Sequence, residues 1–195
     1  MTPSPSPLAP EHFDLIASSL RRSRKLHKAA RVARFNGMTM IVFAVLSLAF
    51  GLGSPTDLFL GLVLGIVAVR ELMAAKRLDM LKLDAPRSLA ISEGILACGL
   101  VTYAALKIAQ AFHPDPAITA QVHQLDSVLG SDGSQSLSHM MSAITIAAYI
   151  GLAVGSIITQ GLLVLYYLKR GRMLQGYLSQ TPAWIVQLER TIRSA

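Results

Sequence analysis

Among the polar side chains inside otherwise apolar stretches of the sequence, four are of types and at depths that could carry chemistry in a membrane. They are Arg70, Glu71, Glu93 and Gln160. Burying an ionisable group in hydrocarbon is costly unless the group is paired or hydrated, so such groups mark ion pairs, proton relays or substrate sites. These four residues therefore form the candidate intramembrane polar cluster.

The depth of these residues suggests how they are used. Arg70, Glu71 and Glu93 are expected roughly 7 to 9 Å inside the same boundary of two neighbouring apolar segments, so that Arg70 could pair with Glu93. Such a pair would be structural, whereas a proton-linked or substrate-binding Glu93 is the alternative. Gln160 is expected to form a hydrogen bond between helices.

Signatures of other chemistry are missing from the sequence. There is no phosphate-binding glycine loop, HExxH motif, nucleophile elbow or membrane-protease serine pattern, so a non-enzymatic structural or interaction protein is predicted. A small proton- or ion-coupled transporter that uses Glu93 is the alternative, and an enzyme acting on lipid is the third hypothesis. No recognised zinc spacing is present, and no histidine lies in an apolar stretch where it could ligate haem. We therefore predict no metal and no cofactor.

The elements that must position the polar cluster are four apolar blocks near bilayer length. The 195 residues are 52% hydrophobic and only 15% charged, which is too apolar for one soluble domain. The blocks cover about residues 35–53, 58–75, 88–112 and 141–168. We predict an all-α fold that forms a four-helix transmembrane bundle over residues 35–168. A cleavable signal peptide is not expected, because more than thirty residues precede the first block.

The net charge of +7 is distributed along the chain so that it defines a topology. Every basic residue except Lys107 lies before the first block, around the connection between the second and third, or after the fourth. The other two connections, residues 54–57 and 113–139, contain no Lys or Arg. By the positive-inside rule both termini and the central connection are cytoplasmic, and Lys107 is expected to extend to the outer interface.

The segments that flank the bundle are predicted to be helical and amphipathic. Residues 1–10 form a proline-rich tail expected to be disordered, and residues 11–34 form a basic helix that lies on anionic lipid headgroups. Residues 169–195 form a second cytoplasmic amphipathic segment, and a short helix is expected in the outer connection. No nucleic acid is expected, because no aromatic platform accompanies the charge. The basic residues of the first helix that share one face are Arg21, Arg24, Lys25, Lys28 and Arg31.

Small residues recur within the apolar blocks at four-residue spacing, which marks faces where helix backbones approach closely. They predict tight packing within one chain or between two copies, so a homo-oligomer or a membrane-protein partner is expected. Cys98, the only cysteine, excludes an intramolecular disulfide. The predicted packing positions are Gly61, Gly65, Ala90, Gly94, Cys98, Ala147, Gly151 and Gly155.

Three short segments resemble small bacterial inner-membrane proteins with four transmembrane helices and no known activity. The segments are Tyr166-Tyr167-Leu168-Lys169-Arg170, Thr181-Pro182-Ala183-Trp184-Ile185-Val186 and Arg34-Phe35-Asn36-Gly37. The resemblance implies a multi-pass protein of the bacterial inner (cytoplasmic) membrane and implies no activity. Small multidrug transporters also combine four spans with a membrane glutamate, but they are shorter and carry the glutamate in the first span, so that family is not assigned.

Overall fold

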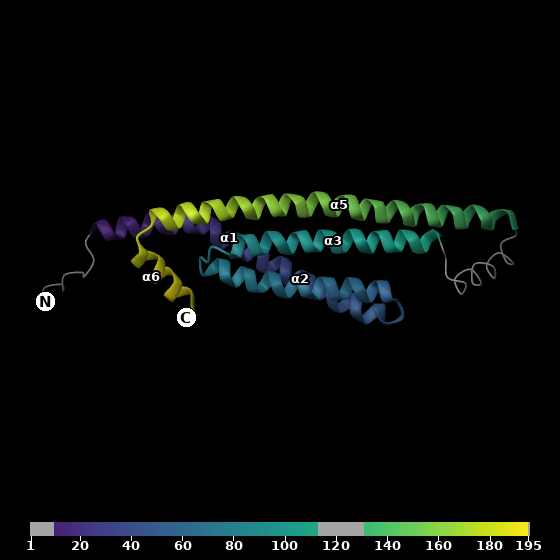
Figure 1. The fold of residues 1–195 in the computed structure, drawn as a ribbon, viewed down its shortest axis with the longest axis horizontal. Coiled ribbons are helices and arrows are strands. Elements are labelled where there is room, and N and C mark those ends of the chain that lie inside the picture. The colour runs from purple at the N-terminus through teal and green to yellow at the C-terminus, as the bar shows by residue number, and fades with distance from the viewer. Residues whose placement is uncertain (1–9, 113–130, 195) are drawn as a thin grey trace. The chain divides into compact units, whose positions relative to one another are not determined.

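The computed structural model describes residues 10–112 and 131–194, and both ranges consist of helices joined by turns, without a strand (Figure 1). Four of the helices are long and apolar enough to cross a membrane. The predictions of an all-α chain and of four membrane-length helices are thereby confirmed, and they support a multi-pass membrane protein. The elements are α1 (Pro10–Phe50), the short 3-10 helix η1 (Gly51–Gly53), α2 (Pro55–Asp79), α3 (Ala85–Phe112), α5 (Ser131–Gln180) and α6 (Ala183–Ser194).

Two helices extend well beyond the apolar blocks that they contain. Helix α1 includes both the basic segment 11–34 and the first apolar block, and α5 begins ten residues before the expected fourth span and continues to Gln180. No proline interrupts either stretch, so nothing in the backbone chemistry stops the helix at the end of the apolar block. The helix predicted within residues 113–130 lies outside the described residues, as do residues 1–9 of the predicted tail of residues 1–10, whereas Pro10 begins α1.

The two short connections have simple chemical causes. Pro55 opens α2, the backbone N–H of Asp57 donates to the Ser54 hydroxyl at 3.4 Å, and Asp57 places its carboxylate in the first turn of the helix. At the other end of α2, Leu81 adopts a left-handed conformation with φ 54°, and the N–H of Lys82 donates to the carbonyl of Arg77 at 3.0 Å. This pattern closes α2 and turns the chain into α3.

The chain divides into two compact units, each built from parts of several helices. The first unit comprises Met1–Ile41, Ile66–Ser92 and Leu163–Ala195, and the second comprises Val42–Gly65 and Glu93–Leu162. The first unit contains a continuous apolar core. The members of this core include Leu26, Ala29, Ala30 and Ala33 of α1, Ala74, Ala75 and Leu78 of α2, Leu89 of α3, Tyr167, Leu174 and Tyr177 of α5, and Val186 of α6.

Close backbone approach holds helices together inside the second unit. In the second unit a Cβ atom added at Gly61 would lie 2.7 Å from Cγ of Leu48, and one added at Gly99 would lie 2.4 Å from Cγ1 of Val63. Both glycines are therefore needed for the packing observed there, because such contacts are shorter than carbon atoms tolerate. Gly61 was among the predicted packing positions, and Gly99 was not.

Candidate functional site

The most extensive polar arrangement of the described residues is centred on His27, in the first unit and outside the apolar block of α1. Its Nδ1 lies 3.3 Å from Oδ1 of Asp79, and its Nε2 lies 2.8 Å from Oε1 of Glu189. His27 is 9% exposed and Glu189 6%, so both groups are buried. Because a carboxylate faces each ring nitrogen, the arrangement favours an imidazolium that donates on both sides.

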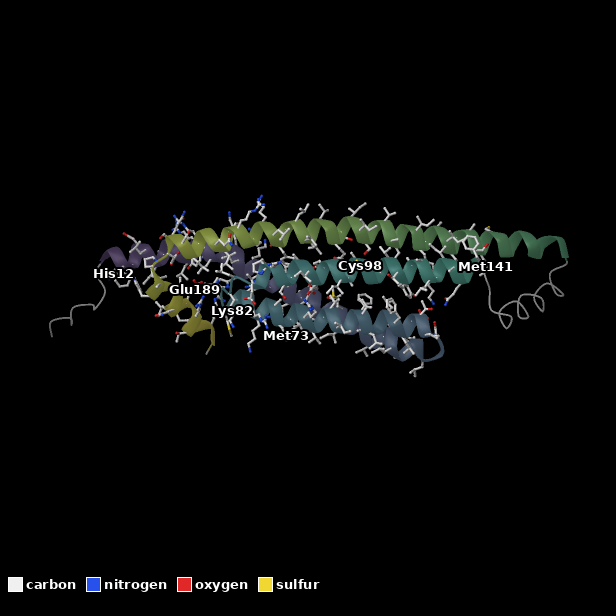
Figure 2. The ribbon with its side chains drawn as sticks, viewed as in Figure 1. His12, Met73, Lys82, Cys98, Met141 and Glu189 are labelled. Atoms are coloured by element: carbon white, nitrogen blue, oxygen red, sulfur yellow. The ribbon has the colours of Figure 1, made fainter. Side chains whose placement is uncertain are left out.

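Two further side chains extend this network. Arg34 forms an ion pair with the second carboxylate oxygen of Asp79, and the hydroxyl of Tyr177 donates to Oε2 of Glu189 at 2.8 Å. We call His27, Arg34, Asp79, Tyr177 and Glu189 the histidine network. It connects α1, α2, α5 and α6, and its member on α6, Glu189, is labelled in Figure 2.

The charges of the network stabilise one another. Burial raises the pKa of Glu189, but hydrogen bonds from His27, Ser23 and Tyr177 outweigh it and bring the pKa from 4.5 down to about 2. Burial lowers the pKa of His27, and the hydrogen bonds to Asp79 and Glu189 overcome this effect, so that the pKa is raised from 6.5. Near neutral pH the network therefore holds ionised carboxylates around a histidine that favours its protonated form.

Helix α6 is also attached to the connection between α2 and α3. The guanidinium of Arg190 donates to the carbonyl oxygen of Met80 at 3.1 Å and to that of Leu81 at 3.3 Å. These carbonyls belong to the turn in which Leu81 takes its left-handed conformation, so Arg190 satisfies backbone groups that the helix end leaves open. Together with Glu189, it fixes α6 to two other parts of the first unit.

The basic helix predicted for residues 11–34 presents two different faces in the structure. Leu26, Ala29, Ala30 and Ala33 belong to the core of the first unit, so this face of α1 is covered by protein. The opposite face is exposed and carries all five of the predicted basic residues, Arg21, Arg24, Lys25, Lys28 and Arg31. We call these five residues the basic face of α1. Its contact with anionic lipid stays a prediction.

A hollow of about 510 Å³ lies beside the histidine network, between α1 and α6. Its volume falls within the range of roughly 300 to 1,000 Å³ that is usual for small-molecule sites. Apolar side chains of both helices form its walls, and charged groups line it as well. The lining residues are Ile16, Ser19, Leu20, Arg34, Asp79, Ile185, Leu188, Glu189, Ile192 and Arg193.

The predicted intramembrane polar cluster is divided between the two units. In the first unit, Glu71 is fully buried and its two carboxylate oxygens accept hydrogen bonds from Nδ2 of Asn36 at 3.0 and 3.1 Å. Arg70, also in the first unit, is half-buried. Glu93 is fully buried in the second unit, where Gln160 is half-buried. The expected pairing of Arg70 with Glu93 stays a prediction.

Asn36 is a site residue that the sequence analysis did not single out. It lies one residue into the first apolar block, and an amide at that position signals a need for hydrogen bonding inside a helix bundle. Its pairing with Glu71 gives that buried carboxylate a donor from a neighbouring helix. Glu71 is therefore held within the first unit by a partner on α1.

The predicted small-residue rows do not all make contacts inside the chain. Gly61 packs tightly against Leu48, as described above, whereas a Cβ added at Gly94, Gly151 or Gly155 would meet no atom of the described residues within 4 Å. Cys98 is exposed. The sequence left open whether the small residues pack within one chain or between two copies. For these three glycines, packing between two copies stays a prediction.

A second polar group, which the sequence analysis also missed, lies in the second unit near the short connection after η1. Asp57 accepts two hydrogen bonds, one from Nζ of Lys107 at 3.0 Å and one from the hydroxyl of Tyr103 at 2.9 Å. Beside them, Nε2 of Gln110 donates to the hydroxyl of Thr56 at 2.7 Å. The Tyr103 ring also meets the edge of Tyr149, with centroids 5.9 Å apart. Lys107 therefore joins α3 to α2, a role beyond the extension to the interface that was expected.

Comparison with known proteins adds no assignment. No protein-family model, curated protein or solved structure matches this chain. The bacterial origin implied by the short resembling segments therefore stays a proposal. Within the described ranges no three His, Cys, Asp or Glu side chains are grouped so that they could hold a metal ion, and the histidine network is no exception.

The histidine network has the chemistry of a structural connection. Both nitrogens of its imidazole are engaged by carboxylates, and the carboxylates are in turn engaged by Arg34 and Tyr177. Such closed networks specify how helices dock, and breaking one member leaves buried charge unpaired. The network can thus hold α6 in one place against the rest of the first unit.

Proposed function

We propose that this chain is a non-enzymatic interaction protein of the bacterial inner membrane, with both termini in the cytoplasm. In this proposal the part of the first unit outside the apolar blocks is a cytoplasmic head, which carries the basic face of α1 toward anionic lipid headgroups and a membrane-protein partner. The homo-oligomer expected from the small-residue rows belongs to the same proposal. Support for the orientation comes from the positions of the basic residues.

One observation carries the proposal: α1 buries its alanine-rich face in the core and leaves its basic face exposed. A helix that only needed to be soluble would mix charges of both signs on that face. A cluster of basic residues directly before a membrane span attracts anionic headgroups, on the order of 1 kcal/mol for each residue held near the surface. The rigid docking of α6 gives the head a defined shape for a protein partner.

The test is site-specific photo-crosslinking in intact bacteria. A photoreactive amino acid at Lys25 or Lys28 should capture anionic lipid or one reproducible protein. The matched control is the same amino acid at Met38, an exposed position of α1 inside the apolar block, which should give general lipid adducts. Identical adduct patterns at Lys28 and Met38 would contradict the proposal, because the basic face would then have no ligand of its own.

A second function is favoured by the two fully buried carboxylates, Glu71 and Glu93. Carboxylates within membrane helices serve proton-coupled transporters, so a small proton- or ion-coupled transporter that uses Glu93 is the alternative. Purified protein in liposomes should then conduct protons or exchange a cation for protons, and Glu93→Gln should abolish the flux without unfolding the protein. Wild-type liposomes that match protein-free ones under a proton gradient would remove support for this alternative.

A further inference from the structure

A small polar cavity of about 170 Å³ lies in the first unit between the ends of α2 and α3, apart from the histidine network. It is lined by Arg70, Met73, Ala74 and Arg77 from α2 and by Ser88 from α3. The α2 residues follow one another at three- and four-residue spacing and so share one face of the helix. Met73, one of the lining residues, is labelled on α2 in Figure 2.

Arg70, one of the lining residues, carries a donor that no described residue satisfies. Its Nε atom is buried, and no described residue accepts a hydrogen bond from it. Leaving a buried donor of a charged group without a partner is costly, so the position favours an anion that reaches the guanidinium. Since Arg70 belongs to the apolar block of α2, water alone is a poor substitute at that depth.

A second cationic group borders the same cavity. Arg77 uses Nη1 to pair with Asp84 at 3.1 Å, in a salt bridge whose side chains are both about half exposed. Exposed pairs of this kind contribute little and exchange readily. The other nitrogens of Arg77 can therefore turn toward an anion, and Ser88, which is half-buried, can add a hydroxyl donor.

The size and the walls of the cavity narrow the class of ligand. About 170 Å³ is below the roughly 300 Å³ at which sites for whole small molecules begin, and it suits a single tetrahedral oxyanion. Guanidinium groups match phosphate oxygens in geometry and charge. Met73 is 51% exposed beside the arginines and offers an apolar surface to hydrocarbon attached to the phosphate.

We propose that the cavity between Arg70, Arg77 and Ser88 binds the phosphate group of an anionic phospholipid from the cytoplasmic leaflet. The inference rests on the proposed orientation, which places Arg77 and Ser88 near the cytoplasmic headgroups and Arg70 about two turns deeper, inside the apolar block. Free phosphate shares the recognised chemistry, and the lipid is favoured because the cavity combines cationic groups with an exposed apolar side chain. The site is separate from the basic face of α1, which belongs to the proposed function.

Native mass spectrometry of the full-length protein in detergent tests the site. Phosphatidylglycerol is added to wild type, to Arg70→Gln and to Arg172→Gln, which removes an equal charge from an exposed position on α5. Loss of a charge-assisted contact should weaken retention of the lipid about ten-fold or more in Arg70→Gln and leave Arg172→Gln near wild type. Equal loss in the two variants would overturn the site, because retention would then follow net charge alone.

Two further arms identify the source of the phosphate. Phosphatidylcholine, which is zwitterionic, should be retained several-fold less than phosphatidylglycerol, and equal retention would overturn the choice of an anionic lipid. Glycerol phosphate at the same concentration should not displace phosphatidylglycerol. Displacement would show that the cavity takes soluble phosphate and would overturn the lipid assignment.

A pair of milder variants keeps the proposal testable if Arg70→Gln fails to fold. Ser88→Ala should weaken retention, whereas Asp84→Asn should strengthen it, because it releases Arg77 and removes a negative charge near the phosphate. No change in either variant would overturn the site. Neither residue belongs to the basic face of α1, so these results are independent of the crosslinking that tests the proposed function.

Discussion

Replacing Glu189 by glutamine should release α6 from the first unit. The variant keeps the size of the side chain and removes its charge, so the buried His27 loses the nearer of its two carboxylate partners, at 2.8 Å. The pKa of Glu189 falls from 4.5 to about 2 in the folded protein. At about 1.4 kcal/mol for each pKa unit, this difference corresponds to roughly 3 kcal/mol of stabilisation in the wild type.

The same charges set a pH dependence with a defined sign. The contribution of Glu189, whose pKa is lowered, is present above about pH 4.5 and is lost as the pH falls toward 2. The contribution of His27, whose pKa is raised, is complete below about pH 6.5 and is lost as the pH rises through its raised value. Docking of α6 should therefore be strongest between about pH 4.5 and 6.5.

The assay uses Trp184, the only tryptophan of the chain, which lies on α6 with its ring 5.6 Å from that of His12. Quenching of its fluorescence by acrylamide should increase in wild type as the pH rises from 6 to 9. In Glu189→Gln quenching should already be high at pH 6. Asp14→Asn, which removes an exposed carboxylate of α1, is the control and should follow wild type. Equal quenching of wild type and Glu189→Gln at every pH would show that Glu189 does not hold α6 in place.

Two further predictions concern packing and buried charge. Gly61→Leu should destabilise the protein by about 1 to 3 kcal/mol, because its side chain would collide with Leu48, whereas Gly151→Leu should leave the thermal unfolding of the monomer unchanged in detergent. Equal effects of the two substitutions would contradict the observed packing. Asn36→Leu removes the two hydrogen bonds that Asn36 donates to Glu71 and should cost about 1 to 3 kcal/mol, which Glu71→Gln in the same chain should partly restore. Additive losses in this double variant would show that the hydrogen bonds contribute little.

The sequence predicted the parts of the fold that follow from local composition. Four apolar blocks gave four membrane-length helices, because block length and hydrophobicity are properties of contiguous residues. The ends of α1 and α5 could not be placed by the same argument. Helix continues into polar sequence wherever no proline or capping residue stops it, and tertiary packing then stabilises the extension.

The histidine network could not be predicted, because it joins residues far apart in the chain. His27 is separated from Asp79 by 52 positions and from Glu189 by 162. Two signals were nevertheless present in the sequence. His27 stands next to Leu26, which belongs to the apolar face of a basic helix, and Glu189 follows Leu188 and lies one turn from Ile185 and Ile192 on α6. A polar residue on an apolar helix face indicates a buried partner, although the sequence does not say which one.

The topology of the membrane-length helices underlies both proposals, and cysteine accessibility tests it most directly. Single cysteines would replace Ser6, Ser127 and Ser179 in a Cys98→Ala background, and intact cells would be treated with a membrane-impermeant thiol reagent. With both termini in the cytoplasm, only the cysteine at position 127 should react from outside, while those at positions 6 and 179 should react only after the cells are opened. Labelling at position 6 or 179 in intact cells would contradict the cytoplasmic head on which the proposed function depends.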